Sequence, residues 1–308
     1  MKVVVTGAAG HLGSVLVELL LRRDIDIIGV DTLLYGGEGL LSCFSHPRFR
    51  FVKRDVREDL AGALGDGVDA VVHLAALVGP VCEQDPQAAW QVNHAATTNV
   101  CQWARRTGAK VIFASTCSNY GVYDGLATEE SPLSPLGVYA QTKTAAERSI
   151  TGLLDDGVTL RFGTLAGLSP RPRFDTLLNQ LACEACSQGR IVCRRPLARR
   201  PFLHIRDAAQ AVLTLLAQWP RARHRCYNVV GFNTTIRELA EAIRAETGCA
   251  IEEEAAVVDG RDYAVSAALI NNDLGFQPQF GLRECVTEIC NGIRLGIVRP
   301  RQEHYNAI

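Results

Sequence analysis

Short β-branched runs recur through the first half of the chain, and each is followed by a segment in which apolar residues repeat with helical spacing. Strands that alternate with helices predict a parallel sheet joined by right-handed crossovers. We therefore expect an α/β fold of the Rossmann type, with a doubly wound parallel sheet. The expected strands are residues 2–6, 26–31, 50–53, 69–74, 111–115 and 158–161, and the longest expected helix is residues 85–106.

The alternation changes after residue 163, where a segment rich in Gly, Ser and Pro begins. Helices are expected over residues 176–188, 207–218, 235–247 and 282–295, and strands over 226–230 and 252–257. We therefore expect a first domain of residues 1–163, to which residues of about 204–231 return. Residues 164–308 are expected to form a smaller C-terminal α/β lobe that binds substrate.

Composition narrows the class of protein. The chain has 308 residues, of which 47% are hydrophobic and 21% charged, and its net charge is -1. This balance is typical of a globular protein and offers no field that would attract nucleic acid or a membrane. No apolar run reaches the ~20 residues that span a bilayer. The 11 Cys form no disulfide or metal pattern, so we expect reduced thiols in a cytoplasmic protein without a metal site.

Three glycines separate the first strand from the first helix. Gly7, Gly10 and Gly13 have the spacing G-x-x-G-x-x-G. Glycines at such a turn permit close approach of a pyrophosphate, which the helix N-terminus attracts. A simple tight turn is the alternative. Asp31 ends the second strand, where a carboxylate binds the adenosine ribose and disfavours a 2′-phosphate, which favours NAD over NADP.

Tyr139 and Lys143 are four residues apart, so on a helix both side chains project from one face. An ammonium held beside a phenol favours the phenolate, which predicts a tyrosine pKa nearer neutral pH. An ordinary surface pair has the same spacing. The proton-transfer interpretation of the pair is favoured by its surroundings. Carboxyl ends of expected strands, where such sheets bind ligands, carry Gly7, Asp31, Ala75, Ser115 and Thr116.

Together these motifs resemble the extended short-chain dehydrogenase/reductase family, and most closely its nucleotide-sugar epimerases and dehydratases. The resemblance covers nearly the whole chain. It rests on residues 6–13, 55–56, 73–76, 93, 114–121, 139–143 and 200–207, which occur in the order of that family.

The resemblance implies a role for each matching residue. Tyr139 would be the acid/base, Lys143 its electrostatic partner, and Thr116 the hydroxyl that holds the reacting sugar oxygen. The residues implied to bind NAD are Gly7, Gly10, His11, Leu12, Gly13, Asp31, Asp55, Val56, Leu74, Ala75, Ala76, Asn93, Ser115, Tyr139 and Lys143. Those implied to bind a nucleotide-diphosphate sugar are Cys117, Ser118, Arg173, Asn179, Arg200 and Arg261.

The residues after Thr116 separate the reactions of this family. The dehydratases that the chain resembles carry Asp-Glu there, and the decarboxylases keep a Glu in the second position. Here Cys117 and Ser118 stand in those places, and neither is a carboxylic acid. We therefore expect an NAD-dependent nucleotide-sugar 4-epimerase. The alternative is a nucleotide-sugar ketoreductase or dehydrogenase. A 4,6-dehydratase and a non-catalytic NAD-binding protein are less favoured by the sequence. By analogy with relatives, we expect a homodimer.

Overall fold

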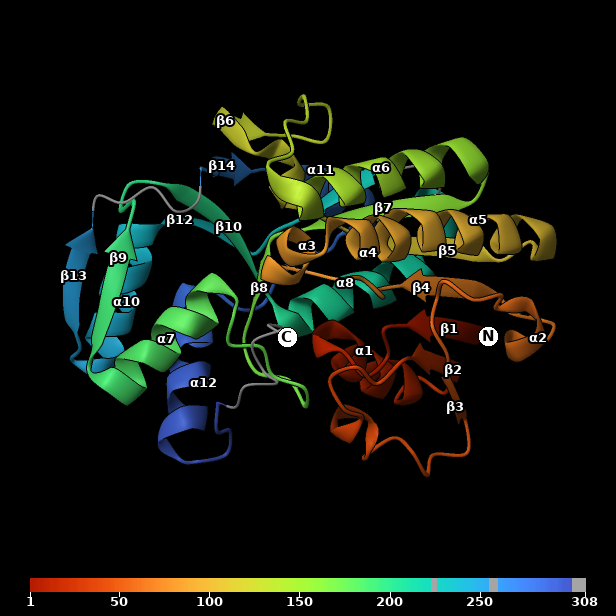
Figure 1. The fold of residues 1–308 in the computed structure, drawn as a ribbon, viewed down its shortest axis with the longest axis horizontal. Coiled ribbons are helices and arrows are strands. Elements are labelled where there is room, and N and C mark those ends of the chain that lie inside the picture. Colours follow the sequence, from red (N-terminus) through yellow and green to blue (C-terminus); the bar gives the residue numbers. More distant parts are fainter. Residues whose placement is uncertain (223–225, 255–259, 301–308) are drawn as a thin grey trace.

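The computed structural model describes residues 1–222, 226–254 and 260–300. A large parallel sheet with helices on both faces makes up one side of the molecule, and a smaller lobe makes up the other (Figure 1). The lobe is built from α7 (Leu177–Gln188), α10 (Ile236–Thr247), α12 (Leu282–Arg294), β9 (Arg190–Arg194) and β13 (Ala250–Glu254). The expected α/β fold is confirmed.

The main sheet has seven strands in the order β11-β7-β5-β4-β1-β2-β3, and every neighbouring pair is parallel. The sequence predicted all seven as strands, and the seventh, expected over residues 226–230, lies in the segment expected to return from the second half. The strands are β1 (Lys2–Thr6), β2 (Asp26–Asp31), β3 (Phe49–Lys53), β4 (Ala70–His73), β5 (Lys110–Thr116), β7 (Gly157–Phe162) and β11 (Cys226–Val229).

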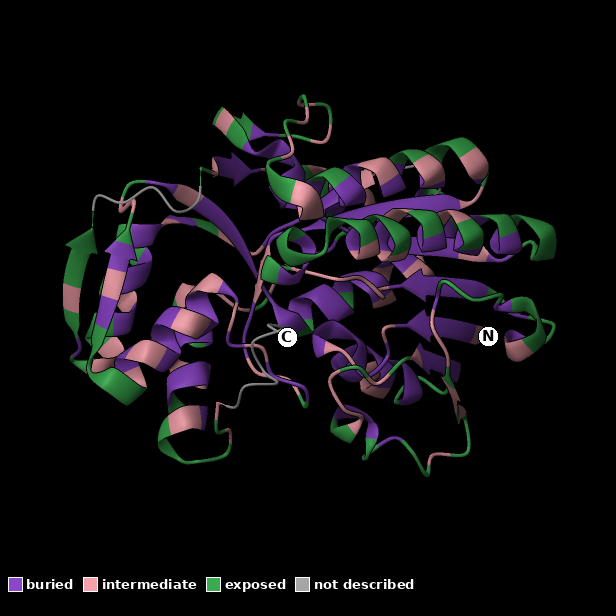
Figure 2. Ribbon diagram, in the orientation of Figure 1, coloured by how far each residue is buried: buried purple, intermediate pink, exposed green. Residues whose placement is uncertain are grey.

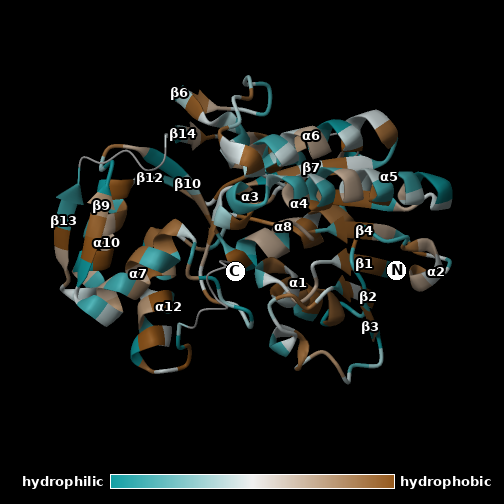
Figure 3. Ribbon diagram, in the orientation of Figure 1, coloured by the Kyte–Doolittle hydropathy of each residue, from teal (hydrophilic) through white to brown (hydrophobic). Residues whose placement is uncertain are grey.

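Two apolar cores lie on the two faces of this sheet, because successive side chains of a strand point to opposite faces. Val3 and Val5 of β1 belong to one core and Val4 to the other. The first core packs under α1 (His11–Leu21), α8 (Ile205–Ala217), α9 (Trp219–Ala222) and α11 (Ala268–Leu274). The second packs under α2 (Ala61–Leu64), α5 (Ala96–Thr107) and α6 (Gly137–Leu153). The buried, apolar strands stand out in Figures 2 and 3.

The long helix expected over residues 85–106 contains a π turn. Asp85 caps α4 (Pro86–Trp90) by accepting from Ala88 N, and a π segment, η2 (Gln91–Ala95), leads into α5. Such turns are commonly found at functional sites. The π turn carries Asn93, and α3 (Pro80–Gln84) precedes the whole run.

The smaller lobe has its own core between three helices and a parallel pair of strands. The helices are α7 (Leu177–Gln188), α10 (Ile236–Thr247) and α12 (Leu282–Arg294), and the strands are β9 (Arg190–Arg194) and β13 (Ala250–Glu254). Thr235 and Glu238 form a capping box at the start of α10. Residues 255–257 of the strand expected over 252–257 lie outside the described residues, as do residues 301–308.

Short strands that the sequence did not predict connect the two parts. β8 (Thr164–Ala166), β10 (Arg199–His204) and β12 (Phe232–Thr235) form one sheet, and β6 (Val122–Ala127) pairs with β14 (Asp262–Val265). Two short 3₁₀ turns, η1 (Glu38–Leu40) and η3 (Cys117–Tyr120), also occur among the described residues. β10 and β12 lie between the lobe and the main sheet, so the connections place the lobe beside the carboxyl ends of the strands (Figure 1).

Candidate active site

A cavity of about 820 Å³ lies where the carboxyl ends of the strands face the smaller lobe. It is large enough for a cofactor and a substrate together. The structure brings most of the sequence-predicted site residues into its wall. They are Gly7, Gly10, His11, Leu12, Gly13, Asp31, Asp55, Val56, Leu74, Ala75, Ala76, Ser115, Thr116, Ser118, Tyr139, Lys143, Arg173, Arg200 and Arg261.

The glycine turn requires glycine for steric reasons. Gly7 has a φ of +70°, and a Cβ there would lie 2.8 Å from the Ala75 nitrogen. A Cβ on Gly13 would lie 2.0 Å from the Gly7 carbonyl oxygen. Any side chain at either position would push the turn apart. The bare backbone therefore faces the cavity beside the N-terminus of α1, an arrangement suited to a pyrophosphate.

Asp31 closes the same end of the cavity at the end of β2. Its Oδ2 accepts from Ala9 N at 3.0 Å, and its Oδ1 accepts from Leu33 N at 2.8 Å. Burial raises the pKa of this carboxyl, while the hydrogen bonds from Leu33 and Ala9 oppose the rise. The carboxylate is therefore fixed in place beside the glycine turn, where it can accept hydrogen bonds from ribose hydroxyls.

Thr116, Tyr139 and Lys143 all line the cavity. Burial raises the pKa of Tyr139 to about 12, against the charges of Arg173 and Arg261 and a hydrogen bond with Thr116. Burial also lowers the pKa of Lys143 to about 7, and its Nζ lies 4.0 Å from the centroid of the Phe113 ring. The prediction of a tyrosine pKa nearer neutral was therefore wrong for the ligand-free site, because desolvation outweighs the nearby cations.

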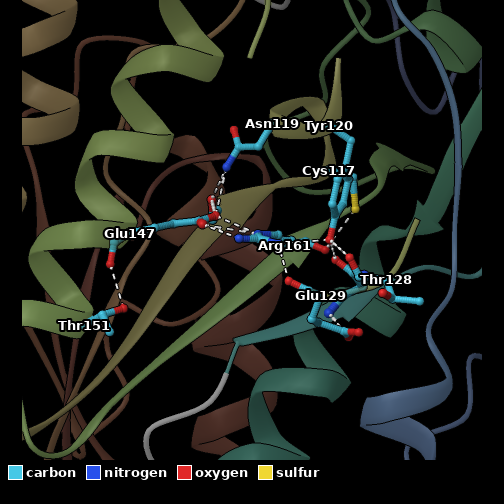
Figure 4. A network of polar contacts seen from close by, with 10 residues as sticks. Cys117, Asn119, Tyr120, Thr128, Glu129, Glu147, Thr151 and Arg161 are labelled. Carbon is cyan, nitrogen blue, oxygen red and sulfur yellow. Dashed lines mark hydrogen bonds and ion pairs between the residues drawn. The ribbon is translucent and has the colours of Figure 1, made fainter. Parts of the chain in front are cut away.

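A buried polar network supports this centre from behind (Figure 4). The Glu147 carboxylate, one helical turn after Lys143, accepts from Arg161 Nη2 at 2.7 Å and from Asn119 Nδ2 at 2.8 Å. It also accepts from the Ser115 hydroxyl. Since Ser115 and Asn119 flank Thr116 in sequence, Glu147 holds the Thr116 segment against the helix that carries Tyr139.

Three sequence-predicted site residues lie behind the cavity wall instead of in it. Asn93 donates to Leu77 O at 3.0 Å and to Thr142 Oγ1 at 3.1 Å. Asn179 bonds both backbone groups of Gly167, at 3.1 and 3.0 Å. The Cys117 thiol donates to Arg161 O at 3.2 Å. All three are buried, and each holds a segment that carries wall residues.

Other residues of the wall are not among the individual site residues expected from the sequence. Tyr35 and Arg171 line the cavity beside Asp31, and Asp175 lies in the wall where it binds Arg173. Arg173 donates to Asp175 through Nε at 2.9 Å and Nη2 at 2.8 Å. The sequence placed Arg173 in the substrate site without its carboxylate partner, although Asp175 is only two residues away.

Neither a metal cluster nor a membrane span is evident in the part of the chain that the structure describes. No group of three His, Cys, Asp or Glu residues there is arranged to hold a metal ion. No helix there is long and apolar enough to cross a membrane.

Comparison with known families matches the geometry of the cavity. The model of the NAD dependent epimerase/dehydratase family matches residues 3–229, which include the glycine turn, Asp31, Thr116 and the Tyr139–Lys143 pair. The chain belongs to the NAD-dependent epimerase/dehydratase family. This family lies within the extended short-chain dehydrogenase/reductases, and its cofactor is NAD, which the bare glycine turn and the fixed Asp31 carboxylate fit.

Relatives within this epimerase/dehydratase family catalyse different reactions. A UDP-glucose 4-epimerase from Mycolicibacterium smegmatis is 30% identical, with 94% of this chain and 97% of that protein covered. UDP-glucuronic acid decarboxylase 6 from Arabidopsis thaliana is 26% identical, with 98% and 91% covered. The solved structure of DesIV, a dTDP-glucose 4,6-dehydratase from Streptomyces venezuelae with NAD bound, is 26% identical, covers 96% and 97%, and has a TM-score of 0.86.

Proposed function

We propose that the protein is a nucleotide-sugar 4-epimerase that oxidises C4 of its substrate transiently. The observation that carries this proposal is the chemistry beside Thr116. Cys117 is buried with its thiol on Arg161 O, and the Ser118 hydroxyl accepts from Arg261 Nη1 at 2.9 Å. Neither can act as the carboxylic acid that elimination of water or loss of CO₂ would use at this place. Tyr139 remains as the acid/base beside the reacting carbon.

The oxidation would take a proton from the sugar 4-OH and a hydride from C4, and Tyr139 is the group of this chain that would accept the proton. Tyr139 takes the proton from the sugar 4-OH, which Thr116 holds by a hydrogen bond, and Lys143 stabilises the charged form of the pair. Bound NAD supplies the hydride acceptor at C4, the hydride donor in the second half-reaction, and a positive charge that favours the phenolate. After the 4-keto sugar had turned over in the cavity, Tyr139 would return the proton to its oxygen as C4 is reduced again. Net oxidation is zero.

The cationic wall of the lobe supports a diphosphate in the substrate. Arg173, Arg200 and Arg261 line the same cavity as Tyr139. Guanidinium groups donate paired hydrogen bonds to phosphate oxygens, so this wall suits the diphosphate of a nucleotide sugar. Arg200 Nη1 is anchored on Arg199 O at 2.9 Å and on Arg261 O, which fixes the direction of its guanidinium.

A nucleotide-sugar ketoreductase or dehydrogenase would use the same three catalytic residues. The two reactions differ in whether NAD is consumed. The test is incubation with UDP-, dTDP-, GDP- and CDP-sugars without added reductant, followed by proton NMR. We expect a product inverted at C4 from at least one sugar. A product that forms only with added NADH or NADPH would establish the reductase, and no turnover with any sugar would favour a non-catalytic NAD-binding protein.

We also propose a homodimer that pairs the exposed faces of the α4–α5 run and of α6. These faces are solvent-exposed in one copy of the chain (Figure 2). Trp90 on α4 is 40% exposed, and its ring lies edge-on to the ring of His94. Light scattering at micromolar concentration should give twice the mass of the chain, and Trp90→Glu should reduce it. A monomer mass for the unmodified protein would exclude the dimer.

A further inference from the structure

A loop of the smaller lobe reaches across to the glycine turn of the other domain. His11 follows Gly10, and its Nδ1 lies 2.8 Å from Ser169 Oγ and 3.1 Å from the carbonyl oxygen of Arg171. Ser169 Oγ donates to the same carbonyl at 2.6 Å. These contacts join two segments that are far apart in sequence, and they fix the backbone of Arg171 beside the glycine turn.

The Arg171 side chain then stacks on the loop that follows β2. Its Cζ lies 4.5 Å from the centroid of the Tyr35 ring, and only 7% of the residue is exposed. A Cβ added to Gly39 of this loop would lie 3.3 Å from Arg171 Cβ, so the absence of a side chain there makes room for the arginine. Pro170 and Pro172 restrict the backbone on both sides.

The guanidinium therefore lies in the half of the cavity that faces the cofactor. Arg171 and Tyr35 both line the cavity together with Asp31 and the glycine turn. The charge of Arg171 is close enough to Asp31 to oppose the rise in the pKa of that carboxyl. A pyrophosphate beside the glycine turn would bring two negative charges to the side of the cavity that Arg171 lines.

We propose that Arg171 is a cofactor-binding residue supplied by the substrate lobe, which pairs with the NAD pyrophosphate and, stacked on Tyr35, retains NAD between turnovers. The glycine turn approaches the pyrophosphate through its backbone, and Arg171 approaches it from the facing lobe with a bidentate donor. Cofactor release then requires the loop around Arg171 to separate from Tyr35 and His11. This inference rests on NAD as the cofactor and holds whichever reaction the enzyme catalyses.

The test uses ligands that contain or lack the pyrophosphate. Binding of NAD, ADP-ribose and adenosine to cofactor-free protein is measured by calorimetry for the unmodified chain and for Arg171→Met, which keeps most of the aliphatic stem. Loss of a charged hydrogen-bonding partner should weaken the affinity of the protein for NAD and for ADP-ribose by about 10-fold to 100-fold. Adenosine should bind with unchanged affinity. NAD should also dissociate faster from the loaded Arg171→Met protein in stopped-flow measurements.

Two further variants separate pairing from stacking and folding. Tyr35→Phe keeps the aromatic ring and should keep the slow release of NAD, whereas Tyr35→Ala should speed the release.

Arg190→Met is the control for loss of charge, because it removes an exposed arginine that pairs with Glu252 at 3.1 Å. If Arg171→Met does not fold, Arg171→Lys, which keeps the charge without the planar fork, should weaken NAD by a smaller factor. Unchanged NAD affinity in a folded Arg171 variant, or an equal loss for adenosine, would overturn the proposal.

Discussion

Arg161 on β7 holds the carboxylate of Glu147 on α6 through two nitrogens, with Nη2 2.7 Å from Oε2 and Nε 3.0 Å from Oε1. The two side chains are 8% and 9% exposed. Glu147 lies on the helix that carries Tyr139 and Lys143, and the strand that carries Arg161 pairs with β5, which ends at Thr116. The ion pair therefore fixes the position of the acid/base relative to the hydroxyl with which it acts.

Removing one charge of this pair should destabilise the whole domain. Glu147→Gln leaves Arg161 buried without its counter-ion, and such a loss costs about 3–5 kcal/mol of the free energy of unfolding. Glu252→Gln, which breaks an exposed pair with Arg190, is the matched control and should cost less than about 1 kcal/mol. Urea unfolding measures both. Equal effects of the two substitutions would show that the buried pair has no special role in stability.

Tyr139→Phe should remove catalysis while the fold stays intact and NAD still binds, with at most the loss of the contact from the Tyr139 hydroxyl. The phenyl ring fills the same space, while the proton acceptor is lost, which typically costs a factor of about 10²–10⁴ in kcat. Steady-state rates with the sugar identified by NMR and calorimetric NAD binding check the two parts. Tyr123→Phe, whose hydroxyl accepts from Ser131 at 3.2 Å outside the cavity, is the control. A Tyr139→Phe enzyme with full activity would assign the acid/base role to another group.

Asp31→Asn should weaken the binding of NAD and reduce the preference of the protein for NAD over NADP. The neutral amide binds the ribose hydroxyls less strongly, and it repels a 2′-phosphate less. Replacing a charged acceptor in this way should cost about 10-fold to 100-fold in NAD affinity. Asp26→Asn at the exposed start of the same strand is the control. If the variant kept the NAD affinity of the unmodified protein, Asp31 would serve only to hold the backbone of Ala9 and Leu33.

Acid should destabilise the ligand-free protein through two buried histidines. Burial lowers the pKa of His11 and of His73 from 6.5 to about 3. Between these values the unfolded chain binds the protons and the folded chain does not, so stability falls as pH falls from 6.5 towards 3. Each histidine contributes about 1.4 kcal/mol per pH unit in this window.

Urea unfolding at several pH values between 7 and 4 measures this slope. His73→Gln should reduce it by the contribution of one proton. A slope that does not respond to His73→Gln would mean that another group takes up the proton.

The sequence could predict the sheet and the cofactor half of the site because both depend on local patterns. Each β-branched run became a strand, as Val3 to Val5 show by dividing between two cores. The glycine turn and Asp31 fall at strand ends, and parallel strands bring their carboxyl ends to one edge. Thr116, Tyr139 and Lys143 reach the same cavity for this reason.

The rest depends on contacts between distant segments, which leave no periodic signal. Asn93 and Asn179 have the polarity of ligand-binding residues, but backbone groups of other segments already occupy their amides. Arg171 is not among the individual site residues expected from the sequence, and only the fold shows that Tyr35 and His11 lie beside it. The pKa of Tyr139 also depends on the fold, since Arg173 and Arg261 come from the lobe and burial outweighs both.

Transfer of a deuterium label at C4 tests the central claim most directly. The nucleotide sugar found by the NMR screen is prepared with deuterium at C4 and incubated in ordinary water with the NAD-loaded protein and no reductant. We predict a product inverted at C4 that retains the deuterium, because the hydride leaves and returns through the same bound cofactor. Loss of the deuterium, or no inverted product until a nicotinamide reductant is added, would contradict epimerisation by transient oxidation at C4.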